Sequence, residues 1–147
     1  MRRAVLDTNV LASGFSVHDS IPDRLLRLWL TGAWELIVSA PIIAEFERTF
    51  EKRYFQARLS TRQPRENIGL LRRRATLVSI TAQVSGVATH LEDDVILSVA
   101  VSARAQYLVT GDERFRRQVP SYQGVQFISP REFLELLVEE AQRGWIP

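Results

Sequence analysis

The chain has 147 residues, of which 46% are hydrophobic and 24% are charged, and its formal net charge is +2. It has no cysteine, which excludes disulfides, zinc–thiolate sites and thiol nucleophiles, and its two histidines, His18 and His90, are too few for a histidine-rich metal site. A bound metal ion would therefore be held by carboxylates, which favours Mg²⁺ or Mn²⁺.

The length fits a single domain covering residues 1–147. No apolar stretch reaches the ~18 residues that a membrane span requires, and Asp7 interrupts the first apolar run too early for a signal peptide. We therefore expect a cytoplasmic protein with no membrane partner.

The first half of the chain predicts strands and helices in alternation. Residues 3–7 form a short apolar strand, and a helix around Pro22 follows and ends at Gly32. A second strand covers 34–39, and a helix over 41–55 follows it.

The pattern continues with a helix over 62–74 and a third strand over 75–80. The polar residues 81–91 predict a loop, and a helix over 93–105 is apolar nearly all round, which is typical of a buried helix. A fourth strand over 106–112 ends in a tight turn.

A fifth strand over 125–129 precedes the last helix, which Ser129 and Glu132 open as a capping box with Pro130 at its first position. Strands that alternate with helices predict an α/β protein. We expect a three-layer α/β/α fold with a central parallel sheet of about five strands.

Four chain segments place carboxylates near the carboxyl ends of these strands. Asp7 ends the first strand, Asp112 follows the fourth, Glu45 lies early in the helix after the second, and Asp93 and Asp94 open the helix before the fourth. In an open parallel sheet, these positions share the edge where such folds bind ligands.

Taken singly, each of these acids is explained as a helix-capping charge or a turn residue. Taken together, they would repel one another and raise one another's pKa. A divalent cation with oxygen ligands is the usual means of stabilising such a group.

Four motifs occur in a fixed order: AVLDTNVLASG, SAPIIAEFERTF, EDDVILSVAVSARAQYLVTGDERF and FISPREFLELL. In this order they resemble the PIN domain family, and within it the toxins of toxin–antitoxin systems related to VapC. The resemblance implies a Mg²⁺- or Mn²⁺-dependent endoribonuclease on a parallel-sheet α/β/α fold. It also implies an RNA substrate, a cognate antitoxin protein and a homodimer.

Carried over residue by residue, the catalytic and metal-binding acids of the family fall on four positions: Asp7, Glu45, Asp94 and Asp112. The third falls on Asp94 because its spacing to Thr110 fits the family pattern, while Asp93 stays open as the alternative. Asn9 and Thr110 match the polar residues that support the first and fourth acids. The small residue pair that usually follows the third acid is Ser98 and Val99 here, which affects packing.

The chemistry of phosphodiester hydrolysis agrees with these residue types. It needs charge neutralised on the non-bridging oxygens, an activated water and a stabilised leaving oxygen, and metal ions held by carboxylates supply all three. The expected products carry a 5′-phosphate and a 3′-hydroxyl.

The segment from Arg48 to Arg74 holds nine basic and two acidic residues, a net charge of +7, with Tyr54 and Phe55 among them. Such a stretch can pair with phosphates and stack on bases. It can equally be a solvated helix face or a docking surface for an acidic partner. The candidate RNA contacts are Arg53, Arg58, Arg62, Arg72, Arg73 and Arg74, and three further arginines after the fourth acid could add to them: Arg114, Arg116 and Arg117.

Other functions fit the sequence less well. A haloacid dehalogenase-type phosphatase needs two aspartates two residues apart, but Asn9 holds the second position. A receiver domain needs a lysine near the fifth strand, and Lys52 is the only lysine. A catalytically idle PIN-fold module that binds RNA or protein remains the alternative, and we assign no role to His18 or His90.

Overall fold

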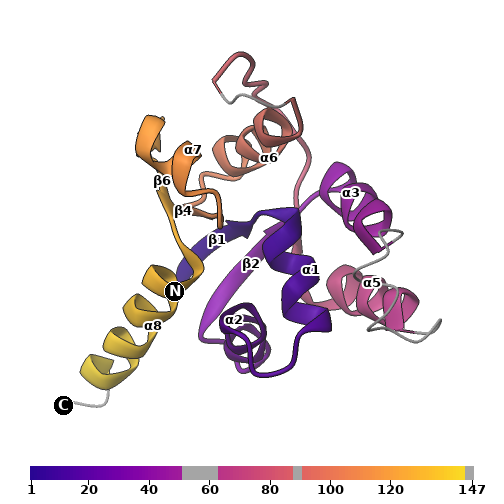
Figure 1. Cartoon of the computed structure of the whole chain (residues 1–147), viewed down its shortest axis with the longest axis vertical. Helices are drawn as coiled ribbons and strands as arrows, with labels where there is room; N and C mark the ends of the chain where they lie inside the picture. Colours follow the sequence, from indigo (N-terminus) through magenta and orange to yellow (C-terminus); the bar gives the residue numbers. More distant parts are fainter. Residues whose placement is uncertain (51–62, 88–90, 145–147) are drawn as a thin grey trace.

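The computed structural model describes residues 1–50, 63–87 and 91–144. Its sheet has six strands in the described part of the chain, in the order β3-β2-β1-β4-β6-β5 (Figure 1). The strands are β1 (Arg2–Leu6), β2 (Trp34–Val38), β3 (Thr76–Leu77), β4 (Tyr107–Val109), β5 (Ser121–Tyr122) and β6 (Val125–Ile128).

Helices connect the strands and flank the sheet. They are α1 (Thr8–Ser16), α2 (Ile21–Leu30), α3 (Ala40–Phe50), α5 (Gln63–Arg74), α6 (Leu91–Ser102), α7 (Glu113–Gln118) and α8 (Pro130–Gly144). In Figure 1, α6 lies above β1 and β4 while α1 and α2 lie below them. The α/β prediction with a mostly parallel central sheet is therefore confirmed.

The sheet departs from the prediction at its two edges. Five strands pair in parallel, and β5 adds a sixth that is antiparallel to β6. The two residues between them, Gln123 and Gly124, both have positive φ, as a tight hairpin turn requires. At the other edge, the strand predicted over 75–80 is only two residues long, and Leu77 is 54% exposed there.

Two helices were not predicted, α1 and α7, and each starts directly after a strand-end aspartate. The helix predicted over 41–55 covers Ala40–Phe50, and the remainder of that prediction lies outside the described residues. Gly14 allows α1 to pack closely on α2, because a Cβ there would meet the Leu26 side chain at 2.5 Å.

The core continues across both faces of the central strands, and Ala4, Val5 and Leu6 of β1 are at most 1% exposed. Such apolar runs are typical of parallel strands that are covered on both sides. Within the described residues, no helix is long and apolar enough to cross a membrane.

Aromatic rings attach α8 to the sheet. The ring of Phe133 lies edge-on to Trp34, with centroids 5.1 Å apart, and 5.6 Å from the ring of Tyr107. Phe133 is fully buried, so its ring joins α8 to both β2 and β4 within the core.

We predict that Phe133→Ala lowers the free energy of unfolding by about 3–5 kcal/mol, the usual cost of emptying a buried aromatic site. Chemical denaturation with far-UV circular dichroism measures this loss. Val138→Ala on the same helix is the control, since Val138 is 46% exposed and its loss should cost less than about 0.5 kcal/mol. Equal losses in the two variants would contradict this account of α8.

Candidate functional site

Strands β1 and β4 lie side by side in parallel and end together. Leu6 pairs with Val109, and the backbone N–H of Asp7 donates to the carbonyl of Val109 at 2.8 Å. The ladder thus extends one residue past β1 and fixes the backbone of Asp7 beside the end of β4.

Thr110 connects the two strand-end aspartates. Its hydroxyl donates to Oδ2 of Asp7 at 2.9 Å, and the backbone N–H of Asp112 donates to the same hydroxyl oxygen at 3.1 Å. Thr110 is 3% exposed, and the guanidinium of Arg116 binds its carbonyl oxygen. The Thr110 side chain therefore has a fixed orientation with the Asp7 carboxylate as its acceptor.

Both aspartates also cap the helices that follow them. Oδ1 of Asp7 accepts from the N–H of Asn9 at 3.4 Å, and Oδ1 of Asp112 accepts from the N–H of Phe115 at 3.0 Å. Helix N-termini favour negative charge, so α1 and α7 stabilise the two carboxylates. The capping explanation of these acids thus holds alongside a metal-binding one, since the Thr110 hydroxyl shows that the second oxygen of Asp7 faces another group.

A small hollow joins these groups. It is lined by Asp7, Ile96, Leu108, Thr110, Asp112 and Phe115, and we call it the acidic hollow. Among the described residues, no lysine or arginine lines it. Burial raises the pKa of Asp7, the Thr110 hydroxyl opposes this by lowering that pKa, and the charge of Asp112 raises it further.

Glu45 lies in a neighbouring pocket. It stands on α3, and its Oε2 binds the Arg48 guanidinium at 2.6 and 3.1 Å. This pocket has a volume of about 310 Å³, and we call it the Thr8 pocket. Its lining residues are Thr8, Pro41, Ile42, Ala44, Glu45, Arg48, Val95 and Ile96.

Ile96 lines both the acidic hollow and the Thr8 pocket, so its side chain stands between Glu45 and the aspartate pair. The sequence assigned no role to Ile96 or Thr8, and Arg48 was only the first residue of the basic segment. The only signal for Thr8 was its position directly after Asp7.

Asp94 has a different environment. It is 5% exposed, and its Oδ2 accepts from the N–H of Gly86 at 3.0 Å. One and two turns later on α6, the hydroxyls of Ser98 and Ser102 accept backbone N–H groups of the same loop, at Val84 and at residues 81 and 82. The face of α6 that carries Asp94 therefore binds the loop over 81–86.

Three predicted residues have no described side-chain contact with the aspartate pair. Asn9 is exposed, and only its backbone N–H touches Asp7. Asp93 belongs to α6, but its side chain lies outside the part of the chain that the structure describes. Glu45 is separated from the pair by Ile96. The structure thus brings together Asp7, Thr110 and Asp112 from the predicted set.

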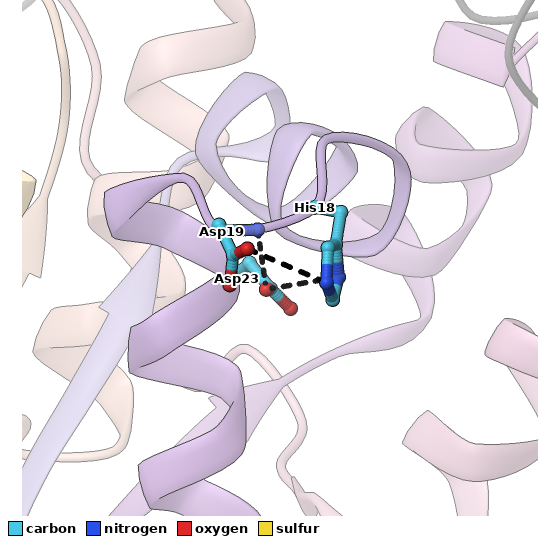
Figure 2. A group of neighbouring side chains, drawn as sticks. All are labelled: His18, Asp19 and Asp23. Carbon is cyan, nitrogen blue, oxygen red and sulfur yellow. Dashed lines mark hydrogen bonds and ion pairs between the residues drawn. The ribbon is translucent and has the colours of Figure 1, made fainter.

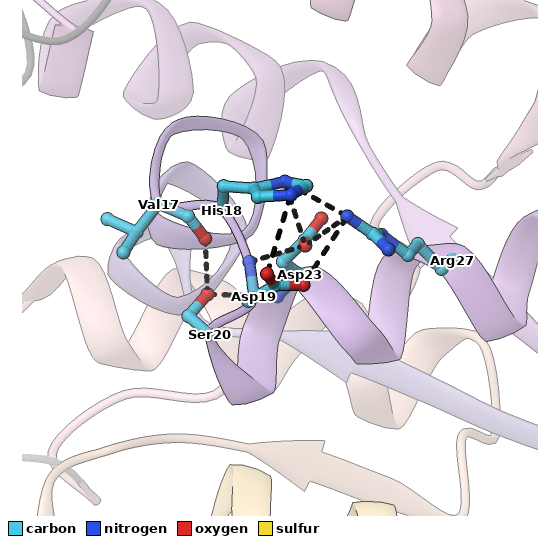
Figure 3. A network of polar contacts seen from close by, with 6 residues as sticks. All are labelled: Val17, His18, Asp19, Ser20, Asp23 and Arg27. Atoms are coloured by element: carbon cyan, nitrogen blue, oxygen red, sulfur yellow. Dashed lines mark hydrogen bonds and ion pairs between the residues drawn. The ribbon is translucent and has the colours of Figure 1, made fainter.

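Within residues 1–50, 63–87 and 91–144, one group brings three possible ligand atoms within 4.8 Å of one another: His18, Asp19 and Asp23 (Figure 2). Arg27 already offsets one of the two negative charges of this group, since its Nη2 lies 3.0 Å from Oδ2 of Asp23 and 3.0 Å from Nδ1 of His18 (Figure 3). The group therefore forms the polar junction between α1 and α2.

This junction lies away from Asp7. Helix α1 starts after Asp7 and has nine residues, so its far end is about 14 Å away along the axis. The group was not predicted from the sequence, where His18 had no assigned partner.

The predicted RNA-binding arginines divide into two sets. Arg72, Arg73 and Arg74 form the last turn of α5, which packs on α3, and Nη2 of Arg74 donates to the carbonyl of Leu30 at 3.1 Å. The second set, Arg53, Arg58 and Arg62, lies outside the described residues. His90 lies outside them as well.

Comparison with known proteins gives a match to one family model, described as PIN domain, over residues 3–114. No curated protein matches the chain. Among solved structures, the fold is similar to a chain in the crystal structure of VapBC2 from Rickettsia felis bound to a DNA fragment from their promoter. The TM-score is 0.60 at 16% identity, and the match covers 86% of this chain and 98% of that one.

We predict that Asp7→Asn raises the melting temperature at pH 7 in metal-free buffer. The folded-state pKa of Asp7 is raised by burial, so above that pKa the ionised carboxylate opposes folding. Asparagine removes the charge and keeps the cap. The advantage of the variant should disappear as the pH falls through the raised pKa, because Asp7 then becomes protonated.

Glu35→Gln is a control of opposite sign in the same pH series. The Thr76 hydroxyl and Arg3 lower the pKa of Glu35, so its carboxylate stabilises the fold above the unfolded-state pKa. That stability is lost as the pH falls through the folded-state pKa. Melting curves in which Asp7→Asn is less stable than the wild type at pH 7 would contradict the account of Asp7.

Proposed function

The chain belongs to the PIN domain family, and from this premise we propose that it is a metal-dependent endoribonuclease. The observation that carries the proposal is the acidic hollow, where Asp7 and Asp112 stand at the ends of adjacent parallel strands and Thr110 links them. This is the edge at which open α/β sheets bind ligands.

The donor set of the acidic hollow fits Mg²⁺ or Mn²⁺. It offers carboxylate and hydroxyl oxygens, which these ions prefer, and no nitrogen or sulfur ligand from the described residues. A nearby cation would offset the raised pKa of Asp7, since it favours the ionised carboxylate. When bound, such an ion supplies charge neutralisation at the phosphate and an acidified water.

The chain's own residues have distinct parts in this scheme. Asp7 and Asp112 would hold the ion with their carboxylates. Thr110 fixes the orientation of the Asp7 carboxylate, and the exposed Asn9 donates its backbone N–H to the other Asp7 oxygen. Outer partners of this kind commonly change metal affinity or activity by about 10–100-fold.

The third acid is Asp93 or Asp94, and we propose Asp93 from its position on α6. Positions three apart on a helix share a face, and position 93 is three before Ile96, which lines the acidic hollow. Asp94 is two before Ile96, and its carboxylate binds Gly86. We propose that Asp94 holds the loop before α6, although the family pattern first suggested it as the third acid.

Glu45 completes the proposed set from the other side of Ile96. Its present partner is Arg48, an ion pair in which the arginine side chain is 62% exposed. Exposed pairs of this kind contribute little stability, about 0–1 kcal/mol, so Glu45 can exchange Arg48 for a water or a metal ion at small cost.

The proposed substrate is RNA, because its negatively charged phosphates can pair with the arginines near the site. Arg48 stands at the rim of the Thr8 pocket, and Arg114 is exposed on α7 two residues after Asp112. The arginines at the end of α5 extend the positive surface, since α5 packs on α3.

We also propose that the protein is the toxin of a toxin–antitoxin pair, with a cognate antitoxin protein as its partner and a homodimer as its assembly. The family resemblance supports this, together with the fold that the chain shares with a chain of the VapBC2 complex. A neighbouring reading frame that encodes a small DNA-binding protein would add support.

The test of the nuclease proposal is cleavage of end-labelled RNA with Mg²⁺ or Mn²⁺. We expect Asp7→Asn and Asp112→Asn to lower the cleavage rate by about 100-fold or more, since each removes a charged metal ligand. The matched controls are Glu113→Gln, next to Asp112, and Asp23→Asn at the α1–α2 junction, and both should retain most activity. The products should carry 5′-phosphates.

The same assay separates Asp93 from Asp94. Asp93→Asn should abolish cleavage and leave the melting temperature unchanged. Asp94→Asn should lower the melting temperature, because the Gly86 N–H loses a charged acceptor. Wild-type protein that binds RNA but never cuts it with either metal would overturn the proposal in favour of an idle PIN-fold binding module.

A further inference from the structure

The Thr8 pocket borders the acidic hollow directly. The two share Ile96 as a wall, and Thr8 follows Asp7 in the chain. A chain of RNA with one phosphodiester at the acidic hollow would therefore have a neighbouring nucleoside next to this pocket.

Thr8 has an unsatisfied hydroxyl. The residue is 4% exposed, and its Oγ1 is buried with no hydrogen-bond partner among the described residues. Buried polar atoms are normally paired, so such an atom needs an explanation. Threonine in a helix has two χ1 rotamers, which allows the hydroxyl to turn toward a ligand in the pocket that Thr8 lines.

The other lining groups suit a flat heteroaromatic ring. Ile42, Val95 and Ile96 provide apolar walls, and Val95 is 38% exposed at the surface. The guanidinium of Arg48 can stack on a base or donate to it, and the Thr8 hydroxyl can donate to a base or accept from it. An apolar cleft with these two polar groups matches the faces and the edge of a nucleobase.

The size of the pocket limits the ligand to one base. Its volume of about 310 Å³ is at the lower end of the roughly 300–1,000 Å³ that is usual for small-molecule sites. Several nucleotides would not fit, and a base within a duplex would have to break its pairing and stacking to enter, a cost that an unpaired base avoids.

We propose that the Thr8 pocket binds one unpaired nucleobase of the RNA substrate, next to the phosphodiester that is cut. The proposal rests on the proposed nuclease function. If the proposal holds, the enzyme prefers a certain base at one nucleotide position beside the cleavage site. Thr8 and Arg48 contact this base and cause the preference.

Cleavage of an RNA library with a randomised single-stranded region tests the proposal, with the base frequencies at the cut ends as the readout. We expect the wild type to prefer one base over the others by about 10-fold at one adjacent position, as a good base contact provides. Thr8→Val and Val95→Trp should reduce this ratio to about 2-fold, since one removes the hydroxyl and the other fills the pocket. The ratio is independent of the total rate.

Val138→Trp on α8 is the matched control for the bulky substitution, and it should keep the wild-type ratio. Melting temperatures establish that the variants fold. Thr8→Val removes an unpaired buried hydroxyl and should melt no lower than the wild type, while residue 95 lies at the surface. Pocket variants that fold and retain the wild-type preference would overturn the proposal, as would a wild type without any preference.

A binding experiment keeps this inference separate from the nuclease proposal. If neither metal supports cleavage, the nuclease proposal fails, and fluorescence anisotropy with labelled four-nucleotide RNAs tests the pocket by itself. Removal of one base, as an abasic site, should weaken binding to the wild type about 10-fold and to Thr8→Val by less than about 2-fold. Equal binding of the abasic and intact RNAs to the wild type would overturn the inference.

Discussion

The site depends on the hydrogen bond from the Thr110 hydroxyl to the Asp7 carboxylate. Each residue directly follows one of two paired strands, β1 and β4. The backbone hydrogen bonds between these strands are therefore enough to bring the two residues together. Thr110 then receives the N–H of Asp112, and this one buried hydroxyl connects two acids that are 105 positions apart in the sequence. A sheet with the same strands in another register would lose this connection.

Capping and metal binding are compatible at these aspartates. One oxygen of each carboxylate receives a helix N–H, which fixes the side chain and stabilises its charge. The other oxygen of Asp7 accepts from Thr110 at the edge of the hollow. Helix capping thus sets the direction of each carboxylate, as the supporting hydrogen bonds of a metal site do.

The alternation of strands and helices along the chain, the mostly parallel sheet and the positions of Asp7 and Asp112 at strand ends were predictable, because apolar runs and strand-end acids are local signals. Helix α1 was missed because its apolar residues lie on several sides and give no clear period. The environments of Glu45 and Asp94 were not predictable. Asp93 and Asp94 differ by about 100° around a helix, and only the packing of Ile96 against the hollow gives α6 its orientation. Likewise, the ion pair between Glu45 and Arg48 depends on side-chain conformations, which the pattern of strands and helices does not predict.

The central claim is that the strand-end acids, and not the His18–Asp19–Asp23 group, bind the divalent ion. Isothermal titration with Mn²⁺ tests this directly on the wild type, Asp7→Asn and Asp23→Asn. We predict one binding isotherm that is weakened at least about 10-fold by Asp7→Asn and is unchanged by Asp23→Asn. Mn²⁺ binding that is retained by Asp7→Asn and lost in Asp23→Asn would contradict the account.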